Sequence, residues 1–229
     1  MTKKICIICT SCDKIGDPAE ATGAWAEEIV APYRVWQKHG YSVTISSIKG
    51  GEVPMDQASL EPPFLNKEVE DFLLDDDAMK GLMESTPLAD IKAADFDAFF
   101  LAGGHGTVGD FPNDPNLIAL LEAAAAAGKV ISSVCHGAEG FVNVKGPDGK
   151  PLVAGKCVTC FTDKEEYAVV KEKLVPFLLE AKLREQGARF EAAKELWAPH
   201  VVADHKLVTG QNPASSAAVA KLVAEVLSS

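Results

Sequence analysis

Short apolar runs recur along the chain, and most are followed by a longer segment with helical spacing. Each run is about four to eight residues long, which is the usual length of a buried strand. Most runs are apolar throughout rather than alternating, as is typical of a sheet covered on both faces. We predict strands at residues 3–10, 41–48, 96–103, 129–135, 156–161, 189–193 and 206–210.

The segments between these strands carry apolar residues at helical spacing. Residues 23–39 show it most clearly, with one apolar stripe formed by Trp25, Ile29, Tyr33 and Trp36. Further helices are predicted at about 67–85, 114–127, 137–142, 163–186 and 213–227. Strands that alternate with helices need crossover connections, which make neighbouring strands parallel. The pattern therefore predicts an α/β fold, a doubly wound sandwich with a mostly parallel sheet.

One helix has clear end signals. Asp114 followed by Pro115 is typical of an N-cap with proline in the first helical position, and Gly128 is typical of a residue just past the end. We therefore predict that this helix begins and ends at these residues.

Residues 49–95 interrupt the alternation. A loop-like stretch rich in proline is followed there by an acidic helical pattern, so we predict a small cap insertion over one end of the sheet. No repeat and no long linker divides the chain, and we expect a single domain over residues 1–229. Ligands of such sheets bind at the carboxyl ends of the strands, so chemistry is expected at strand-to-helix junctions.

Charge and hydropathy narrow the range of partners. The chain has 22 positive and 33 negative side chains, a net charge of −11, and no dense basic cluster. Nucleic acids and anionic membranes are therefore not expected as partners. No apolar run reaches the roughly 18 residues of a membrane-spanning helix, and the first residues do not resemble an export signal. We expect a cytoplasmic protein with reduced cysteines.

The cysteine spacings resemble metal motifs, but the predicted strands argue against a metal site. Cys6 and Cys9 fall in one predicted strand, and Cys157 and Cys160 fall in another. Residues three apart on a strand point to opposite faces of the sheet and cannot share one ion. We therefore predict free thiols and no metal, with Cys12 in the following loop as the thiol most open to redox chemistry.

A glycine-rich loop follows the third predicted strand. Gly104, Gly106 and Gly109 match the letters of a dinucleotide fingerprint, but Pro112 and Pro115 prevent the helix that such a motif needs. We therefore expect no nucleotide cofactor. Glycines at this place let backbone amides approach an anion or an oxyanion closely. The sequence leaves open whether His105 lines a site there or is a structural residue of the loop.

The sequence Val134-Cys135-His136-Gly137 is the strongest candidate for chemistry. A strand runs there directly into small residues and a short helical pattern, which is the arrangement that presents a nucleophile on a sharp turn. A helix N-terminus lowers the pKa of a thiol, typically to about 3.5–7.5, so Cys135 is predicted to be a nucleophile at neutral pH. The alternative is that Cys135 only ends a buried strand.

Five motifs in this order resemble the ThiJ/PfpI superfamily, and within it the branch of glutathione-independent glyoxalases and heat-shock chaperone-like proteins. The matching motifs are TGxxxxE at 22–28, AGGHGT at 102–107, VCHG at 134–137, GKxxTxFTD at 155–163 and TGQNPAS at 209–215. The resemblance implies a flavodoxin-like fold and a homodimer. It also implies conversion of the 2-oxoaldehyde methylglyoxal to D-lactate without glutathione or metal.

The resemblance also implies roles for individual residues. Cys135 matches the nucleophile, and His136 matches its partner. Glu166 matches the acid that orients this histidine, and Glu28 matches the acid that touches the nucleophile. The backbone amides of Gly104 and His136 match the oxyanion donors, and His105 lies beside them in the loop.

Local patterns bear on the two acids. Glu28 lies at the border of the apolar stripe on 23–39, and Glu27 lies on the far side, so Glu27 is the acid expected in solvent. Glu166 and Asp163 have the spacing of a capping box, and so do Glu165 and Thr162. The sequence therefore leaves open which of Asp163, Glu165 and Glu166 orients His136.

Several other functions remain open at this stage. The chain also fits a stress-responsive holdase or an oxidation sensor that uses Cys135. A cysteine peptidase or amidase would use the same Cys-His-acid group. Repair of aldehyde-modified proteins is a property claimed within the superfamily. We favour the glyoxalase because the acids at residues 28 and 166 accompany the Cys-His pair.

Overall fold

The protein is described by a computed structural model of residues 2–16 and 18–229. Within these residues a seven-stranded sheet has the strand order β10-β11-β7-β6-β1-β4-β5. Its strands are β1 (Lys4–Cys9), β4 (Ser42–Ser47), β5 (Thr86–Pro87), β6 (Ala98–Leu101), β7 (Val130–Val134), β10 (Val201–Asp204) and β11 (Leu207–Gly210). Every neighbouring pair is parallel except β10 with β11, so the predicted mostly parallel sheet is confirmed.

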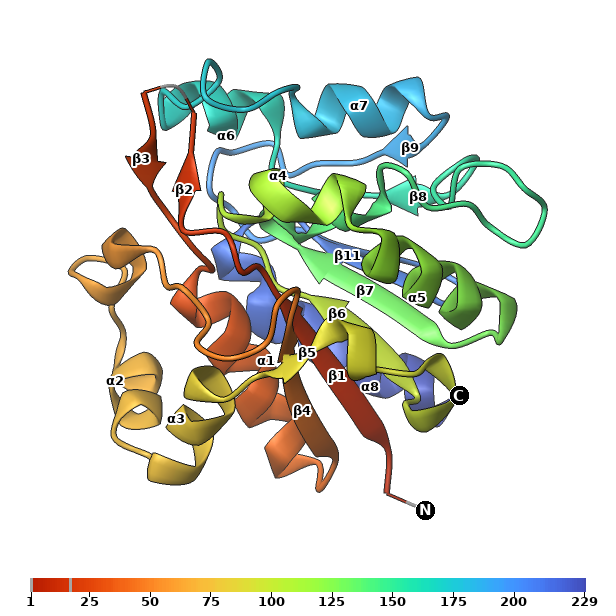
Figure 1. Cartoon of the computed structure of the whole chain (residues 1–229). Coiled ribbons are helices and arrows are strands. Elements are labelled where there is room, and N and C mark those ends of the chain that lie inside the picture. Colours follow the sequence, from red (N-terminus) through yellow and green to blue (C-terminus); the bar gives the residue numbers. More distant parts are fainter. Residues whose placement is uncertain (1, 17) are drawn as a thin grey trace.

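Helices cover both faces of this sheet (Figure 1). The long helices α1 (Ala26–Lys38) and α8 (Ser216–Ser228) lie on one face, and α5 (Pro115–Ala126) and α7 (Leu179–Glu185) lie on the other. Alternate residues of β1 enter the two separate apolar cores, as expected for a strand with period two. Cys9 is in the core beneath α1, and Cys6 is in the core beneath α5, so the prediction that they face opposite sides is confirmed.

Two of the covering helices form as the sequence predicts. The indole of Trp36 on α1 packs edge-on against Phe100 at 5.3 Å between ring centroids. Its Nε1 donates a hydrogen bond of 2.9 Å to the carbonyl of Ala220. At the start of α5 the Asp114 side chain accepts from the Leu117 amide at 2.8 Å, and Gly128 has the positive φ of a residue past a helix end. The end signals predicted for α5 are confirmed.

Two predicted helices are each divided in two. The pattern at 163–186 forms α6 (Asp163–Ala168) and α7, and irregular chain containing Pro176 separates them. The helix α6 ends just before Val170, which has a left-handed φ of +60°, and Pro176 cannot take part in helical hydrogen bonding within the segment that follows. The pattern at 67–85 forms α2 (Lys67–Leu73) and α3 (Asp76–Met83), because the side chain of Asp75 caps the start of α3 instead.

Some of the predicted strands are shorter or lie elsewhere. The runs at 156–161 and 189–193 contain β8 (Cys157–Val158) and β9 (Arg189–Phe190), which pair with each other outside the main sheet. The antiparallel strand β10 was not expected from the sequence. A small hairpin is formed by β2 (Lys14–Ile15) and β3 (Glu20–Ala21), and α4 (Thr107–Asp110) follows β6.

Residues 49–95 flank the sheet on the side of β4 and α1 (Figure 1). They contain α2, α3, the edge strand β5 and the one-turn helices η1 (Gln57–Leu60), η2 (Leu88–Asp90) and η3 (Ala93–Asp95). Phe72 of α2 packs edge-on against Tyr33 of α1 at 5.3 Å between ring centroids. Among the described residues no helix is long and apolar enough to cross a membrane.

Candidate active site

The chain turns sharply at Cys135, where β7 ends. The 3-10 helix η5 (Cys135–Phe141) begins directly after Val134, and Cys135 has a φ of +55°. Such a left-handed conformation is uncommon for a residue other than glycine and is found at functional sites. Gly137 makes the turn possible, because a Cβ at this residue would lie 2.2 Å from the carbonyl oxygen of Leu101. The predicted strand-to-helix turn is therefore confirmed.

A chain of hydrogen bonds leads from Cys135 to two histidines. The Cys135 Sγ is 3.4 Å from Nδ1 of His136, and the Nε2 of His136 is 2.6 Å from the Glu166 carboxylate. The other carboxylate oxygen of Glu166 is 2.8 Å from Nε2 of His105. All four side chains are buried, and the imidazoles of His105 and His136 lie 4.1 Å apart. The structure thus brings together four of the residues singled out in the sequence.

The three candidate acids of α6 have separate partners. Thr162 and Glu165 form a complete capping box, whereas Glu166 does not turn back to the cap and contacts the histidines instead. Asp163 accepts a hydrogen bond from the Ala181 amide. Of the three acids, Glu166 is therefore the one that contacts His136.

Burial and hydrogen bonding fix the charges of this group. Burial by itself would raise the pKa of Glu166, but hydrogen bonds from His105 and His136 outweigh it and hold the pKa well below its ordinary value. Burial, together with the neighbouring His136, lowers the pKa of His105 to about 4. Both imidazoles turn Nε2 toward the Glu166 carboxylate, and the Nδ1 of His136 faces the thiol.

Glu28 lies beside the same thiol. It is fully buried on α1, deeper than its place at the border of the apolar stripe predicts, and its Oε2 accepts from the Gly103 amide at 2.7 Å. Burial raises the pKa of Glu28, and the hydrogen bonds with the Cys135 thiol and the Gly103 amide lower it by a smaller amount. The resulting pKa is about 8. Glu28 is therefore mainly protonated at neutral pH.

The expectation that Glu27 lies in solvent is wrong. Glu27 is half-buried and lines a cavity that Cys135 also lines.

The low thiol pKa predicted for Cys135 is also wrong. Burial, with a smaller contribution from the charge of Glu28, raises this pKa well above its ordinary value, and the backbone amide of His136 lowers it only in part. The helix after Cys135 is a 3-10 helix within the core, so its end is not an exposed dipole facing a solvated thiol. In the resting site Cys135 holds its proton and needs a base to become a nucleophile.

The glycine-rich loop packs closely against the chain before α1. Gly104 has a φ of +97°, and a Cβ there would lie 2.3 Å from the carbonyl oxygen of Gly23. Gly106 donates a backbone hydrogen bond of 3.2 Å to the same carbonyl. These contacts place Gly104 and His105 at the wall of the cavity that Cys135 enters. The role of the Gly104 amide as an oxyanion donor stays a prediction.

The Cys135 cavity has a volume of about 510 Å³. Its lining is mostly apolar and comes from segments far apart in the chain, namely Trp25, Glu27, Phe64, Gly104, His105, Cys135, His136, Phe161, Val169, Trp197, Asn212, Pro213 and Ala214. Of the described residues that line it, none is Lys or Arg.

The contacts of Glu165 with the cavity wall were not predicted from the sequence. This buried carboxylate accepts from Gln211 at 3.0 Å, from Asn212 at 2.8 Å and from the Trp197 amide at 3.3 Å. It therefore fixes two segments that line the cavity. A buried acid in a capping box and a Gln-Asn pair after a strand were visible in the sequence, but nothing in the sequence indicated that they meet.

Three atoms of the site have the chemistry of metal ligands. Nε2 of His105, Nε2 of His136 and a carboxylate oxygen of Glu166 all lie within 4.8 Å of one another. Two imidazoles and a carboxylate are ligands that Zn²⁺ accepts. An ion bound there would displace the protons from both Nε2 atoms. The remaining proton of a neutral His136 would then lie on Nδ1. This nitrogen could not accept the proton of Cys135.

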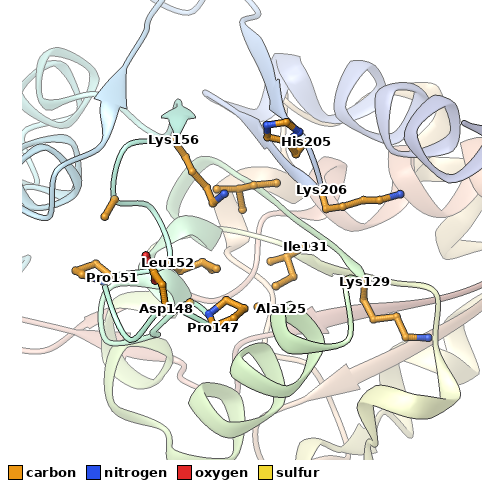
Figure 2. A pocket seen from close by; sticks show the side chains of 14 residues that line it. Ala125, Lys129, Ile131, Pro147, Asp148, Pro151, Leu152, Lys156, His205 and Lys206 are labelled. Atoms are coloured by element: carbon orange, nitrogen blue, oxygen red, sulfur yellow. The ribbon is translucent and has the colours of Figure 1, made fainter.

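A second hollow lies at the opposite end of the sheet and contains none of the predicted site residues. It has a volume of about 400 Å³ and is close to the amino ends of β7 and β11. Figure 2 shows Pro147, Pro151 and Leu152 on one side of it, and Lys129 and Lys206 extending from the other. The Cys135 cavity is therefore the one that combines a nucleophile with proton-transferring groups.

Relatives with similar sequences carry glyoxalase names. Glyoxalase 3 of Candida albicans is 31% identical over 207 residues, which cover 87% of each chain. The glutathione-independent glyoxalase HSP31 of Saccharomyces cerevisiae is 33% identical over 226 residues, which cover 93% of each chain.

Solved structures show the same fold over the whole chain. The 24 kDa rapid encystment protein of Francisella tularensis has a TM-score of 0.93 and 36% identity, with 99% of both chains covered. Glyoxalase III from Candida albicans has a TM-score of 0.89 and 29% identity, covering 98% of this chain and 97% of that one. The flavodoxin-like fold expected from the motifs is confirmed. The model of the DJ-1/PfpI family matches residues 20–226, and this chain belongs to that family.

Proposed function

We propose that the protein is a glutathione-independent glyoxalase that converts methylglyoxal to D-lactate. The observation that carries the proposal is the buried chain from Cys135 through His136 to Glu166, with protonated Glu28 on the other side of the thiol. This group provides a nucleophile, a base and an acid inside one small cavity. The names of the relatives support the same activity.

The first step forms a covalent adduct with Cys135. The bare Nδ1 of His136 takes the thiol proton, and Sγ attacks the aldehyde carbon of the substrate. The carbonyl electron pair moves to oxygen, where the amides of Gly104 and His136 would stabilise the charge. The imidazolium of His136 then returns the proton to this oxygen and leaves a neutral hemithioacetal. Glu166 favours the imidazolium because it holds a carboxylate against Nε2.

The second step moves hydrogen between the two oxygenated carbons. His136 removes the proton from the former aldehyde carbon while Glu28 protonates the ketone oxygen, and an enediol results. The proton on His136 then passes to the second carbon, and the first hydroxyl returns its proton to Glu28. The product of this step is a thioester of lactate on Cys135, and both proton carriers are back in their starting states.

The third step is hydrolysis. His136 takes a proton from water, which attacks the thioester carbonyl, and the departing Cys135 thiolate recovers that proton.

Cys135 supplies the thiol that glutathione would otherwise provide. Glutathione carries two carboxylates. None of the described lining residues is Lys or Arg, so the lining offers these carboxylates no cationic side chain to pair with.

We also propose the remaining features on the strength of the family resemblance. Residues 49–95 act as a cap of a single domain, a role supported by Phe64, which reaches the Cys135 cavity from this segment. The protein is a cytoplasmic homodimer and acts on a small dicarbonyl substrate. Light scattering of the purified chain measures the oligomeric state directly.

The proposal is tested by D-lactate formation from methylglyoxal, without glutathione or added metal. Cys135→Ala should lower the rate by at least about 10³-fold, because the covalent step is lost. The control Cys12→Ala removes a thiol that does not line the cavity and should leave the rate unchanged. Circular dichroism shows whether each variant is folded. A folded wild-type protein without turnover, or a Cys135→Ala variant with near-normal turnover, would overturn the proposal.

One observation favours a second activity as a holdase. Phe64, Val169 and Trp197 are exposed apolar side chains at the mouth of the cavity, and exposed apolar surface binds unfolded chains. If the protein is a holdase, the Cys135→Ala variant should suppress client aggregation as well as the wild-type protein does.

The raised thiol pKa argues against an oxidation sensor, since the thiolate is the form that is oxidised. The buried position of Cys135 argues against a peptidase that binds extended chains.

A further inference from the structure

The Cys135 cavity is larger than methylglyoxal requires. Methylglyoxal has five non-hydrogen atoms, whereas a volume of about 510 Å³ lies in the range of cavities that hold drug-sized ligands. The reacting carbon must lie against Cys135 at the inner end. Most of the cavity would then remain outside contact with the three-carbon substrate.

The space beyond Cys135 has aromatic walls. Phe161 packs against the His136 imidazole at 4.5 Å between ring centroids, and Trp197 lies 5.9 Å from Phe161. On another part of the lining Phe64 packs edge-on against Trp25 at 5.1 Å. Trp197 is 45% exposed and Phe64 is 50% exposed, so both rings have faces free for a ligand. Aromatic surfaces of this kind favour contact with a flat apolar group.

The charge of the cavity lining also limits which substituents a substrate can carry. Glu27 is half-buried in the cavity wall, and none of the described lining residues is Lys or Arg. A carboxylate on the outer part of a substrate would lose water and meet an acid instead of a cation. The cavity therefore suits a neutral substituent.

We propose that the site prefers 2-oxoaldehydes in which a neutral aromatic or bulky apolar group replaces the methyl group of methylglyoxal. Trp197, Phe161 and Phe64 are the specificity-determining residues. The inference rests on the proposed function and uses the same steps: the thiol adds to the aldehyde, the hydrogen moves through an enediol, and water releases the 2-hydroxy acid. Phenylglyoxal would take up one water and leave as mandelate.

The test compares kcat/KM of the wild-type protein for methylglyoxal, phenylglyoxal and 4-carboxyphenylglyoxal. Chiral chromatography of lactate and the mandelates measures the products. We expect kcat/KM to be at least about tenfold higher for phenylglyoxal than for methylglyoxal, and lower again for the carboxylated compound. Equal or lower kcat/KM for phenylglyoxal, with normal turnover of methylglyoxal, would overturn this inference alone. Absence of turnover for all three would overturn the proposed function with it.

Variants at the aromatic wall test the assignment of residues. Trp197→Ala and Phe64→Ala should each lower the ratio of the two kcat/KM values at least about fivefold, and Trp197→Phe should retain most of the preference. Leu196→Ala is the matched control, because Leu196 is as exposed as Trp197 and does not line the cavity. Phe64 is half-exposed in a loop, so its variant is expected to fold even where a Trp197 variant does not. An unchanged ratio in folded Phe64→Ala would contradict the assignment.

A variant of the cavity acid tests the charge argument. Glu27→Gln should raise kcat/KM for 4-carboxyphenylglyoxal relative to phenylglyoxal several-fold, and Glu70→Gln, an exposed acid of α2, should not. No change with Glu27→Gln would overturn this part of the inference. Phenylglyoxal also reacts with arginine, but Arg34, Arg184 and Arg189 lie outside the lining. Initial rates over short times therefore report on turnover.

Discussion

At the scale of the residue, the proposed chemistry depends on which groups carry protons at neutral pH. Glu166 is a carboxylate because two imidazoles donate to it, and His105 is neutral because burial disfavours its charged form. Glu28 and Cys135 both hold their protons. In the proposed mechanism the site therefore starts with a protonated thiol and uses His136 as its base, rather than starting with a preformed thiolate. In this mechanism the thiolate forms only when the substrate is attacked inside the cavity.

The pH dependence of the rate follows from Glu28. Its pKa of about 8 in the free protein means that the proton needed at the ketone oxygen is lost as the pH rises through 8, so kcat/KM should fall there. Glu28→Gln should lower kcat at pH 7 by about 10²–10⁴-fold and remove this alkaline limb. Initial rates between pH 6 and 10 measure both effects, with Glu70→Gln as the control. A wild-type rate that stays constant from pH 7 to pH 9.5 would contradict this assignment.

At the scale of the element, the turn from β7 into η5 positions the nucleophile. Its backbone passes so close to Leu101 that only glycine fits at residue 137. Gly137→Ala should destabilise the fold by about 1–3 kcal/mol, because the added methyl group overpacks the core. It should also lower kcat by at least about tenfold, since a small shift of Cys135 disturbs its alignment with His136.

Urea denaturation and D-lactate formation measure the two effects of Gly137→Ala. Gly146→Ala serves as the control, because a Cβ at Gly146 meets only the flexible end of Asp148 at 3.3 Å and a backbone oxygen at 3.8 Å. Normal stability together with normal turnover in Gly137→Ala would show that the turn tolerates a side chain.

Elements with local signals were predictable, and those that depend on distant partners were not. Asp114 and Gly128 mark the ends of α5 by local backbone chemistry, so the sequence was sufficient there. The pattern at 163–186 is amphipathic on both sides of a break, and only the position of Pro176 hints at the break. The strand β10 is a four-residue edge strand, and it forms because β11 offers a partner.

The residues of the candidate site fall into the same two groups, those with local sequence signals and those that depend on distant partners. Cys135 and Gly104 were predictable, because strand ends and glycines are visible in the chain. The pairing of Glu166 rather than Glu165 with His136 depends on how α6 packs, since both acids have capping-box spacing. The aromatic wall formed by Phe161 and Trp197 joins residues from distant segments, so no local pattern could predict it.

At the scale of the whole molecule, buried acids make stability depend on pH. Burial raises the pKa of Asp110 to about 6 and that of Glu28 to about 8, and it raises the pKa of Glu139 well above its ordinary value. A group whose folded pKa is raised contributes stability below its unfolded pKa of about 4 and loses it as the pH rises toward the folded value. Glu166 acts in the opposite direction, because its pKa is lowered. The maximum of stability should therefore lie on the acidic side of neutral.

Glu139 offers a test of this balance. It is fully buried in η5, and neither carboxyl oxygen has a hydrogen-bond partner among the described residues. The unfolded chain ionises this carboxyl above about pH 4.5, but the folded chain must keep it neutral, which costs free energy that grows with pH. Glu139→Met has a similar length and no charge, so it should raise the free energy of unfolding by about 1–3 kcal/mol at pH 7.5 and by less at pH 5.

Urea denaturation at the two pH values measures this difference. Glu225→Met on α8 is the control, because Glu225 is exposed and should show little change at either pH. If Glu139→Met destabilised the fold equally at both pH values, then its carboxyl would contribute through shape and contacts rather than through protonation. The fall in stability above pH 5 would then have to come from Glu28 and Asp110, and the Glu28→Gln variant would remove the part that Glu28 contributes.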